Sequence, residues 1–275
     1  MKFLLSLLIS ALTALPFTPP PADIGSGGAP SVRLPVFMYH RLLNHPSSRD
    51  PYTITPAAFE SDLKYLGDNG YTTVGSAELL AYAEDGAALP EKPVMLTFDD
   101  GYFNNIHYAA PLLEKYGMKA VIFVVGHYSD LSSKDGIEKP NYSYITWERM
   151  ENLPPSIEIQ NHTWNMHNQR ERTGIRRKRG ESRDTYQQTL ARDIKTLNDK
   201  IELHTGKRPS AFAVPYGLED AWMHDVLRAE GIKMCFCSEM GVSVIKRGDP
   251  AALHRIKRLL RSPAKSAEVL LKKYA

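Results

Sequence analysis

This chain of 275 residues has few cysteines and a small net charge, and both features exclude classes of protein. Two cysteines, Cys235 and Cys237, cannot build a disulfide framework, and a bridge between residues so close in one extended segment would be strained. We expect both to be small apolar residues of the core. A net charge of only +3 does not indicate a nucleic-acid partner, and we expect none.

An apolar run at the N-terminus is too short to cross a bilayer comfortably. It covers residues 3–15, follows a single lysine and is broken at Pro16, which is the pattern of a signal-peptide core. Proline and glycine are frequent directly after it. We therefore expect a signal peptide or N-terminal anchor at 1–22, a flexible linker at 23–31 and one domain at 32–275. A buried N-terminal helix is the alternative. The first interpretation predicts a secreted or cell-surface protein.

From about residue 32, short apolar runs alternate with amphipathic stretches. Runs rich in Val, Ile and Phe are typical of strands covered on both faces, and repeated βα units indicate a barrel or a doubly wound sheet. The expected strands are 34–39, 72–74, 94–98, 120–125, 157–161, 211–214, 234–237 and 254–257. The expected helices are 56–68, 76–84, 104–116, 147–153, 183–204, 218–229 and 263–274. Thr55 and Pro56 are start signals for the first of these helices.

The arginine-rich segment, residues 170–183, interrupts this alternation. Basic residues dominate it and apolar residues are few, so we expect a solvated loop that buries no face. Attraction to an anionic polymer is the functional alternative.

Two adjacent carboxylates follow one of the expected strands. Residues 97–101 read Thr-Phe-Asp-Asp-Gly, directly after the apolar run 94–96. Carboxylates at the end of a buried strand are costly unless they are used. One of Asp99 and Asp100 can ligate a cation while the other transfers protons, and Gly101 permits the tight turn that exposes them. A turn in which the aspartates only cap the backbone is the alternative.

Two histidines and a further turn follow two later strands. His162 and His167 come after 157–161, and a spacing of five does not share a helix face, so they can converge only from a strand end or a loop. Two histidines and a carboxylate commonly surround a catalytic divalent metal, although histidines that only form hydrogen bonds at the surface are frequent. Residues 212–217 read Phe-Ala-Val-Pro-Tyr-Gly, a turn whose backbone N–H could face a developing oxyanion.

In this order, the three motifs resemble the polysaccharide deacetylase family, the NodB-like carbohydrate esterases, over roughly residues 35–258. The resemblance implies an α/β fold, a distorted (β/α) barrel of about seven strands in a single domain. The opening residues 36–40, Val-Phe-Met-Tyr-His, are similar to the branch that includes poly-N-acetylglucosamine deacetylases. No Leu-x-His motif occurs near the end, where residues 253–256 read Leu-His-Arg-Ile.

The resemblance also implies roles in the reaction. Asp100, His162 and His167 would hold a divalent metal, for which we expect Zn²⁺, with Co²⁺, Ni²⁺ and Fe²⁺ as alternatives. Asp99 would be the catalytic base that takes a proton from the attacking water. The substrate would be a polysaccharide containing N-acetylglucosamine. Peptidoglycan or a chitin-like oligosaccharide is the alternative substrate, and an inactive carbohydrate-binding relative is the alternative class. We expect a monomer.

The resemblance also implies which residues bind the substrate. The Tyr216 N–H would stabilise the oxyanion, with Pro215 and Gly217 shaping the substrate-binding turn and His40 lining the same mouth. Without a Leu-x-His frame, His254 is a poor candidate for the general acid. The protonated catalytic aspartate or a water could serve instead.

Overall fold

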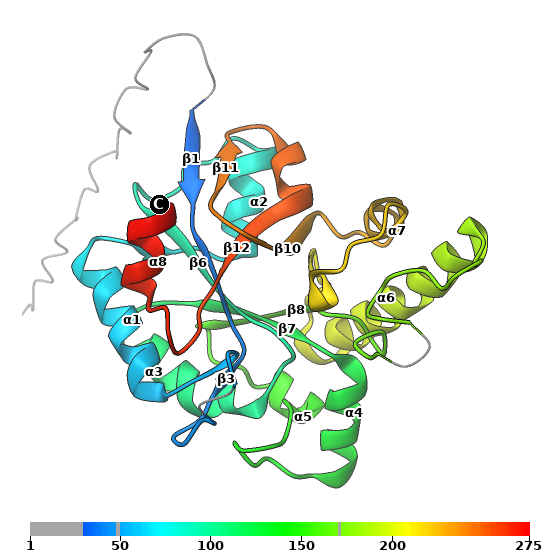
Figure 1. The fold of residues 1–275 in the computed structure, drawn as a ribbon, viewed down its shortest axis with the longest axis horizontal. Coiled ribbons are helices and arrows are strands. Elements are labelled where there is room, and N and C mark those ends of the chain that lie inside the picture. The colour runs from blue at the N-terminus through cyan, green and yellow to red at the C-terminus, as the bar shows by residue number, and fades with distance from the viewer. Residues whose placement is uncertain (1–29, 48–49, 170–171) are drawn as a thin grey trace, which may run out of the picture.

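The computed structural model describes residues 30–47, 50–169 and 172–275, and its centre is a closed parallel barrel ringed by helices (Figure 1). Around the barrel the strands run β2 (Val36–Tyr39), β12 (Ile256–Leu260), β10 (Met234–Met240), β9 (Ala211–Ala213), β8 (Ile157–Asn161), β7 (Ala120–Val124) and β6 (Pro93–Phe98). β6 pairs again with β2 and closes the ring, and every one of these pairings is parallel. The expected distorted (β/α) barrel of about seven strands is confirmed.

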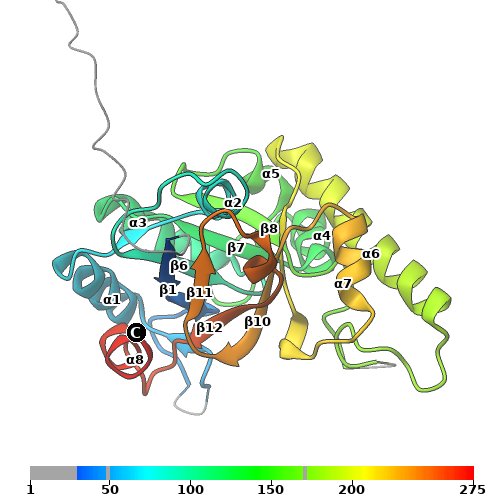
Figure 2. The same cartoon turned by 90° about the horizontal axis from the view of Figure 1, so that it is seen from above.

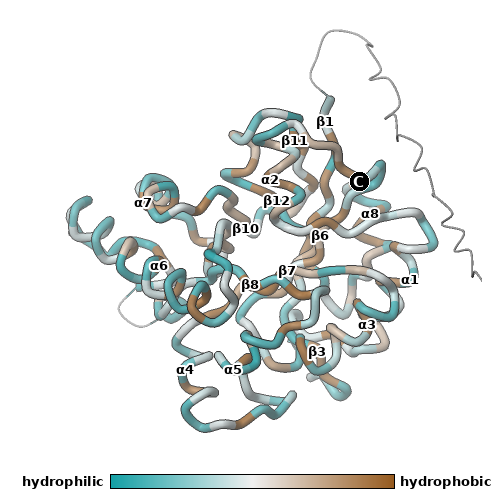
Figure 3. Tube along the Cα trace, turned by 180° about the vertical axis from the view of Figure 1, so that it is seen from behind, coloured by the Kyte–Doolittle hydropathy of each residue, from teal (hydrophilic) through white to brown (hydrophobic). Residues whose placement is uncertain are grey.

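Side chains alternate between the interior of the barrel and the surrounding helices, as the period of a strand requires. Val36 and Met95 belong to one buried cluster, which also contains Phe236 from the opposite side of the ring. Their neighbours Phe37 and Leu96 belong to a second cluster that includes residues of the outer helices. Figure 3 shows the result as hydrophobic strands at the centre and mostly hydrophilic outer helices.

Three short ladders extend the barrel. β5 (Thr72–Thr73) pairs with the start of β6, β1 (Ser31–Leu34) pairs antiparallel with β11 (Ser243–Lys246), and β3 (Arg41–Leu42) pairs parallel with β4 (Thr53–Ile54). The prediction of one strand at 34–39 is wrong, because β1 and β2 are separate strands on either side of Pro35. Proline has no N–H to continue a ladder, so the chain changes partner there.

The helices are α1 (Pro56–Asp68), α2 (Ser76–Glu84), α3 (Ala110–Lys115), α4 (Gly126–Asp135), α5 (Trp147–Met150), α6 (Arg183–Thr205), α7 (Met223–Ala229) and α8 (Ala267–Tyr274). A π-helical turn η1 (Asn105–Ala109) and the 3₁₀ turns η2 (Pro215–Gly217) and η3 (Pro250–Arg255) complete the elements. α1 and α2 have the predicted bounds. The Thr55 side chain accepts a hydrogen bond from the Ala58 N–H, which is the expected cap.

Other boundaries differ from the predictions for local reasons. The helix expected at 104–116 is η1 followed by α3, because Pro111 has no N–H to donate to the preceding turn. α4 was not predicted, since its sequence is polar and rich in serine. The strand expected at 254–257 begins at Ile256, and His254 lies in η3. The last helix begins at Ala267 rather than 263, capped by Ser266.

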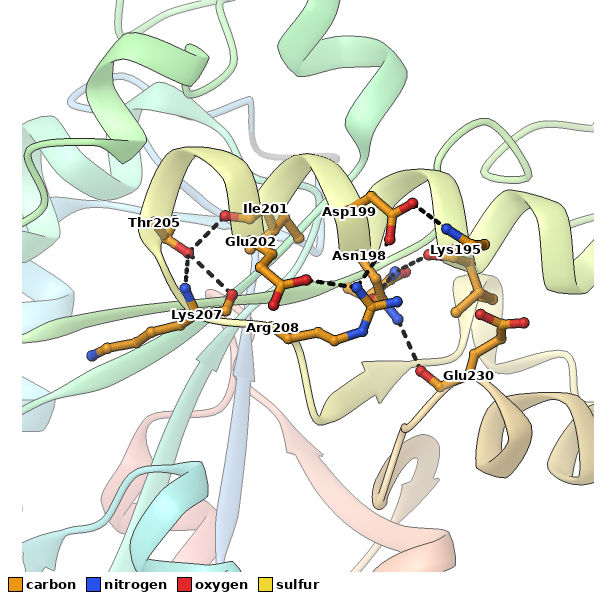
Figure 4. Close-up of polar contacts among 11 residues, drawn as sticks. Lys195, Asn198, Asp199, Ile201, Glu202, Thr205, Lys207, Arg208 and Glu230 are labelled. Atoms are coloured by element: carbon orange, nitrogen blue, oxygen red, sulfur yellow. Dashed lines mark hydrogen bonds and ion pairs between the residues drawn. The ribbon is translucent and has the colours of Figure 1, made fainter.

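The long helix α6 lies along the outside of the barrel next to α7 (Figure 2). Its buried Asn198 ties it to both neighbours. The Asn198 side chain donates to the Glu230 carbonyl at the end of α7 (3.2 Å) and accepts from the Asn161 side chain at the end of β8 (2.8 Å). Figure 4 shows the first of these contacts, beside the ion pairs of Arg208 with Asp199 and Glu202. α6 is thus held at the strand end that precedes His162.

The described part of the arginine-rich segment does bury a face, so the prediction of a solvated loop is wrong there. Ile175 is fully buried in a cluster with Tyr186 and Val214. Arg172 pairs with Glu181 at 2.7 Å, and their side chains are only 10% and 6% exposed. One isoleucine and one inward-facing ion pair leave no periodic signal in a sequence.

The signal peptide expected at 1–22 and most of the linker expected at 23–31 lie outside the described residues, and the first described strand begins at Ser31. No helix of the described residues is long and apolar enough to cross a membrane. Cys235 and Cys237 are buried free thiols in β10, so their predicted place in the core is confirmed.

Candidate active site

The three sequence motifs occupy loops at the carboxyl ends of β6, β8 and β9, on one mouth of the barrel. Each loop contains a residue with left-handed backbone: Asp100 (φ 73°), Thr163 (φ 76°) and Tyr216 (φ 57°). Among the described residues, these are the non-glycine residues with positive φ. This conformation is unfavourable for a residue with a side chain, and such strain concentrates at functional sites because the surrounding structure must enforce it.

Asp100, His162 and His167 converge although they come from two loops. Oδ1 of Asp100 lies 3.7 Å from Nε2 of His162 and 3.2 Å from Nε2 of His167. One donor atom from each residue lies within 4.8 Å of the other two, the one such cluster of potential ligands found in the described part of the chain. Two imidazole nitrogens and one carboxylate oxygen form a donor set suited to a divalent transition metal with open positions.

The His162 ring is oriented by the neighbouring strand. Its Nδ1 lies 2.7 Å from the carbonyl oxygen of Ala213, at the end of β9. Burial lowers the pKa of His162 to about 4, despite the opposing charge of Asp99. The ring is therefore neutral near pH 7, so Nδ1–H donates to Ala213 and the lone pair of Nε2 faces Asp100. A second hydrogen bond of this kind is usual for a metal-ligating histidine.

Asp99 forms a buried, two-pronged ion pair with Arg258 of β12. The two guanidinium nitrogens donate to Oδ1 at 2.7 Å and to Oδ2 at 2.8 Å. Burial alone would raise the pKa of Asp99, but the charge of Arg258 and the hydrogen bonds that it donates hold the pKa well below its ordinary value. The sequence analysis missed Arg258. In the sequence, Arg258 is marked only by its place in a Lys-Arg pair, Lys257 and Arg258, within an apolar strand. That pair does not reveal which of the two side chains points into the barrel.

The loop between the two histidines is held by Asp193 of α6, which the sequence analysis also missed. Its carboxylate accepts the N–H of Trp164 at 2.7 Å and the N–H of Asn165 at 2.9 Å. Burial raises the pKa of Asp193 to about 6, although these hydrogen bonds oppose the shift. Nothing in a polar helix sequence distinguishes this aspartate from those that face solvent.

The convergent residues line a cavity of about 510 Å³. Asp99, Asp100, His162, His167, Tyr216, Gly217 and Arg258 all line it. His40 lines it too, as expected from the sequence, whereas His254 is not among the residues that do. Nδ1 of His40 is buried without a hydrogen-bond partner, and the ring lies 4.8 Å from that of Tyr52. Pro215 is buried and begins the turn that carries Tyr216.

Tyrosine rings surround the mouth of this cavity. Tyr52 and Tyr216 are 48% and 41% exposed, and the Tyr216 ring lies 4.5 Å from that of His167. Tyr102 lines the cavity and stacks on Tyr144 with ring centres 4.9 Å apart. Burial raises the pKa of Tyr144 to about 12, so its hydroxyl stays protonated. The mouth therefore offers flat aromatic faces and hydroxyl groups, which suit a sugar ring.

Known proteins are similar to this chain in sequence and in fold. The family profile described as polysaccharide deacetylase matches residues 86–235. The Bacillus subtilis protein YxkH is 36% identical over 132 residues, which cover 48% of this chain and 42% of that protein. The poly-β-1,6-N-acetyl-D-glucosamine N-deacetylase of Escherichia coli K12 is 26% identical over 226 residues, 74% of this chain and 34% of the enzyme. This chain thus spans less than half the length of either relative.

Among solved structures, a de-N-acetylase from Aggregatibacter actinomycetemcomitans superimposes with a TM-score of 0.76 at 24% identity, covering 88% of this chain and 99% of that one. At this identity the superposition supports the fold alone. The segment matched by the family profile contains Asp99, Asp100, His162, His167 and Tyr216, whereas His40 and Arg258 lie outside it.

Proposed function

Because the chain belongs to the polysaccharide deacetylase family, we propose that it removes N-acetyl groups from a polysaccharide containing N-acetylglucosamine, with a divalent metal ion as cofactor. The observation that carries this proposal is the convergence of Asp100, His162 and His167 beside the buried carboxylate of Asp99. The similarity to a poly-N-acetylglucosamine N-deacetylase along 74% of the chain supports the substrate class.

The donor set supports a bound metal. His162 is neutral, its Nδ1 is engaged by Ala213, and its Nε2 faces the carboxylate of Asp100. Asp100, His162 and His167 would hold the ion, for which Zn²⁺ is our first choice. A divalent ion held there would polarise the acetyl carbonyl and would make water a better nucleophile at neutral pH.

Asp99 accepts the proton of the attacking water in this proposal. Its pairing with Arg258 keeps the carboxylate ionised and fixes its orientation toward the cavity. An ionised, oriented carboxylate is ready to receive a proton as the bond to the acetyl carbon forms. The backbone N–H of Tyr216 would then stabilise the oxyanion from the opposite loop.

The leaving amine must also receive a proton, and the cavity favours His40 for this step. Three histidines line it, and two of them belong to the proposed metal set. His40 is the third, and it lies near enough to Asp99 for its charge to affect the pKa of that carboxylate. Asp99 gains a proton only from the attacking water, and because its pKa is held low, in this proposal that proton is released to solvent. We therefore assign the general acid to His40.

Amine release from β-1,6- and β-1,4-linked N-acetylglucosamine oligomers of graded length tests the substrate. If Tyr52 and Tyr216 stack neighbouring sugars, kcat/KM rises from the monomer to about the tetramer or pentamer, because each added contact improves alignment of the acetamide. Tyr52→Ala should reduce this rise. Tyr142→Ala is the matched control, since Tyr142 is also exposed (59%) but does not line the cavity.

Each alternative predicts a different result in this assay. Equal rates on monomer and pentamer would contradict an extended substrate site. A preference for β-1,4 chains favours the peptidoglycan or chitin-like substrates. Binding of the oligomers without amine release at saturating Zn²⁺ and Co²⁺ favours an inactive carbohydrate-binding relative.

We also propose that residues 1–22 direct export and that the chain acts outside the cytoplasm. The apolar run at 3–15 supports this, as does the polymeric substrate named for the Escherichia coli relative. N-terminal sequencing of the protein recovered from the medium or cell envelope tests export. Recovery of the intact protein in the cytoplasm alone contradicts it.

A further inference from the structure

The described part of the arginine-rich segment, residues 172–183, approaches the turn that carries Tyr216 at Gly174. Gly174 has a left-handed backbone (φ 57°) and adjoins the 3₁₀ turn η2. A Cβ at Gly174 would lie 3.1 Å from Cδ2 of Tyr216 and 3.2 Å from the carbonyl oxygen of Pro215. Both distances are tighter than nine in ten real contacts of a Cβ. A side chain at residue 174 would therefore force Tyr216 or Pro215 to move by a few tenths of an ångström.

Gly174 is itself held firmly in place. Its N–H donates to the carbonyl of Asn168 at 3.0 Å, one residue beyond His167. The next residue, Ile175, is fully buried, and the Arg172–Glu181 ion pair closes the far side of the segment. Gly174 therefore lies between the histidine loop on one side and the Tyr216 turn on the other.

Tyr216 depends on external support. Tyr216 has a left-handed backbone although it is not a glycine. Its side chain is 41% exposed, and the centre of its ring lies 4.5 Å from the centre of the His167 ring. Gly217 is constrained more tightly still, because a Cβ there would lie 1.6 Å from Oγ of Ser238. A strained, partly exposed residue keeps one conformation only when its neighbours enforce it.

We propose that Gly174 is a positioning residue for the deacetylation reaction. Because it has no side chain, the Tyr216 ring and the Pro215 carbonyl can keep their places beside His167. The inference rests on the proposed function, and it gives the arginine-rich segment a role in catalysis that needs none of its charges. Displacement of Tyr216 moves its N–H from the oxyanion position while leaving the metal ligands in place. Errors of about 1 Å in such groups cost on the order of 100-fold in rate.

The same segment supplies a matched control. Gly180 also has a left-handed backbone (φ 75°), but a Cβ there would meet nothing within 4 Å. Gly174→Ala and Gly180→Ala thus share the same type of backbone strain, and only the first adds a contact with Tyr216. A Cβ at residue 174 would displace its neighbours by a few tenths of an ångström. We therefore expect Gly174→Ala to lower kcat by about 3- to 10-fold, with KM and Zn²⁺ affinity near wild type. Gly180→Ala should keep the wild-type kcat.

Asparagine variants guard against misfolding. Asparagine tolerates the left-handed region better than alanine and still carries a Cβ, so Gly174→Asn and Gly180→Asn repeat the comparison with less strain. A double-mutant cycle then identifies the contact. In a Tyr216→Ala background, Gly174→Ala should cost less in kcat than it does in the wild-type background.

A crystal structure of Gly174→Ala provides a readout that does not depend on activity. We expect the Tyr216 ring to have moved relative to His167, with Asp100, His162 and His167 unmoved. An unmoved Tyr216, or equal kcat in the Gly174 and Gly180 variants, would overturn the proposal. An inactive wild-type protein would instead contradict the proposed function, and the position of Tyr216 in the variant would still decide the positioning role.

Discussion

Arg258 shows how one side chain can determine the protonation state of a proposed catalytic group. Its guanidinium is almost completely buried, with 1% of the side chain exposed, and both of its bonds to Asp99 are within 2.8 Å. Such a pair keeps a buried carboxylate charged when burial alone would favour the neutral form. The pair also restricts the orientation of Asp99.

The first prediction concerns Arg258→Gln and the pH dependence of kcat/KM. A base with a lowered pKa is active above that pKa and loses activity as the pH falls through it. Without Arg258, burial dominates and the pKa of Asp99 rises. The acidic limb of the profile should therefore move to higher pH by at least about one unit. Arg258→Lys keeps a positive charge and should move it less. Profiles are measured at saturating Zn²⁺, and an unchanged acidic limb in Arg258→Gln would contradict Asp99 as the base.

The second prediction separates the two adjacent aspartates. Chelation should abolish activity and Zn²⁺ or Co²⁺ should restore it, since the proposed ligands are two imidazoles and a carboxylate. Asp99→Asn should retain stoichiometric metal but lose turnover, whereas His162→Ala should lose metal as well. Metal content by atomic absorption, compared with amine release, distinguishes them. Loss of metal from Asp99→Asn would show that the roles of Asp99 and Asp100 are reversed.

At the scale of single elements, α6 positions the loop between the two histidines. Asp193 accepts two backbone N–H groups of that loop, whose Thr163 is held in a left-handed conformation. Hydrogen bonds that backbone N–H groups donate to a charged carboxylate are stronger than bonds between neutral groups. The helix itself is fixed to β8 and α7 through Asn198.

The third prediction is that Asp193→Ala weakens Zn²⁺ binding by about 10-fold or more, because groups that orient metal ligands typically contribute this much. Asp199→Ala is the control on the same helix, since Asp199 is 46% exposed and pairs only with surface residues. Competition titration with a chromophoric chelator measures both affinities. If the two variants bind Zn²⁺ equally well, the loop does not need Asp193.

At the scale of the whole molecule, the C-terminal helix is attached to the barrel through a buried charge cluster. Asp62 of α1 accepts hydrogen bonds from the Arg261 guanidinium (2.6 Å), the Tyr39 hydroxyl (3.2 Å) and the Ala267 N–H (3.0 Å). This cluster joins α1, β2, the residue after β12 and the start of α8. In Figure 1, α8 lies beside α1, far from α6 and α7.

The fourth prediction is that Asp62→Asn lowers the free energy of unfolding by about 3–5 kcal/mol, because breaking a buried ion pair leaves an uncompensated charge. Asp68→Asn on the same helix should cost no more than about 0.5 kcal/mol, since the Lys64–Asp68 pair is exposed. Urea denaturation measures both. Similar values for the two variants would mean that the buried cluster contributes no more than a surface pair.

Local signals in the sequence were sufficient for several features of this protein. Thr55 and Pro56 determine where α1 begins, because a cap and a first-turn proline act within a few residues. The Asp-Asp-Gly, histidine and Pro-Tyr-Gly motifs each follow an apolar strand, so a common site at the strand ends could be predicted. The chain order of the motifs was enough to identify the family.

Other features were decided only by the tertiary structure, since they depend on pairings between distant residues. Arg258 and Asp99 form an ion pair although they are 159 residues apart in the sequence. Whether Lys257 or Arg258 faces the interior depends on the register of β12 in the closed barrel. Asp193 and Asp199 differ in role because the packing of α6 turns one toward the histidine loop and the other toward solvent. The arginine-rich segment looked solvated because a single buried isoleucine and one glycine at a close contact are invisible to composition and periodicity.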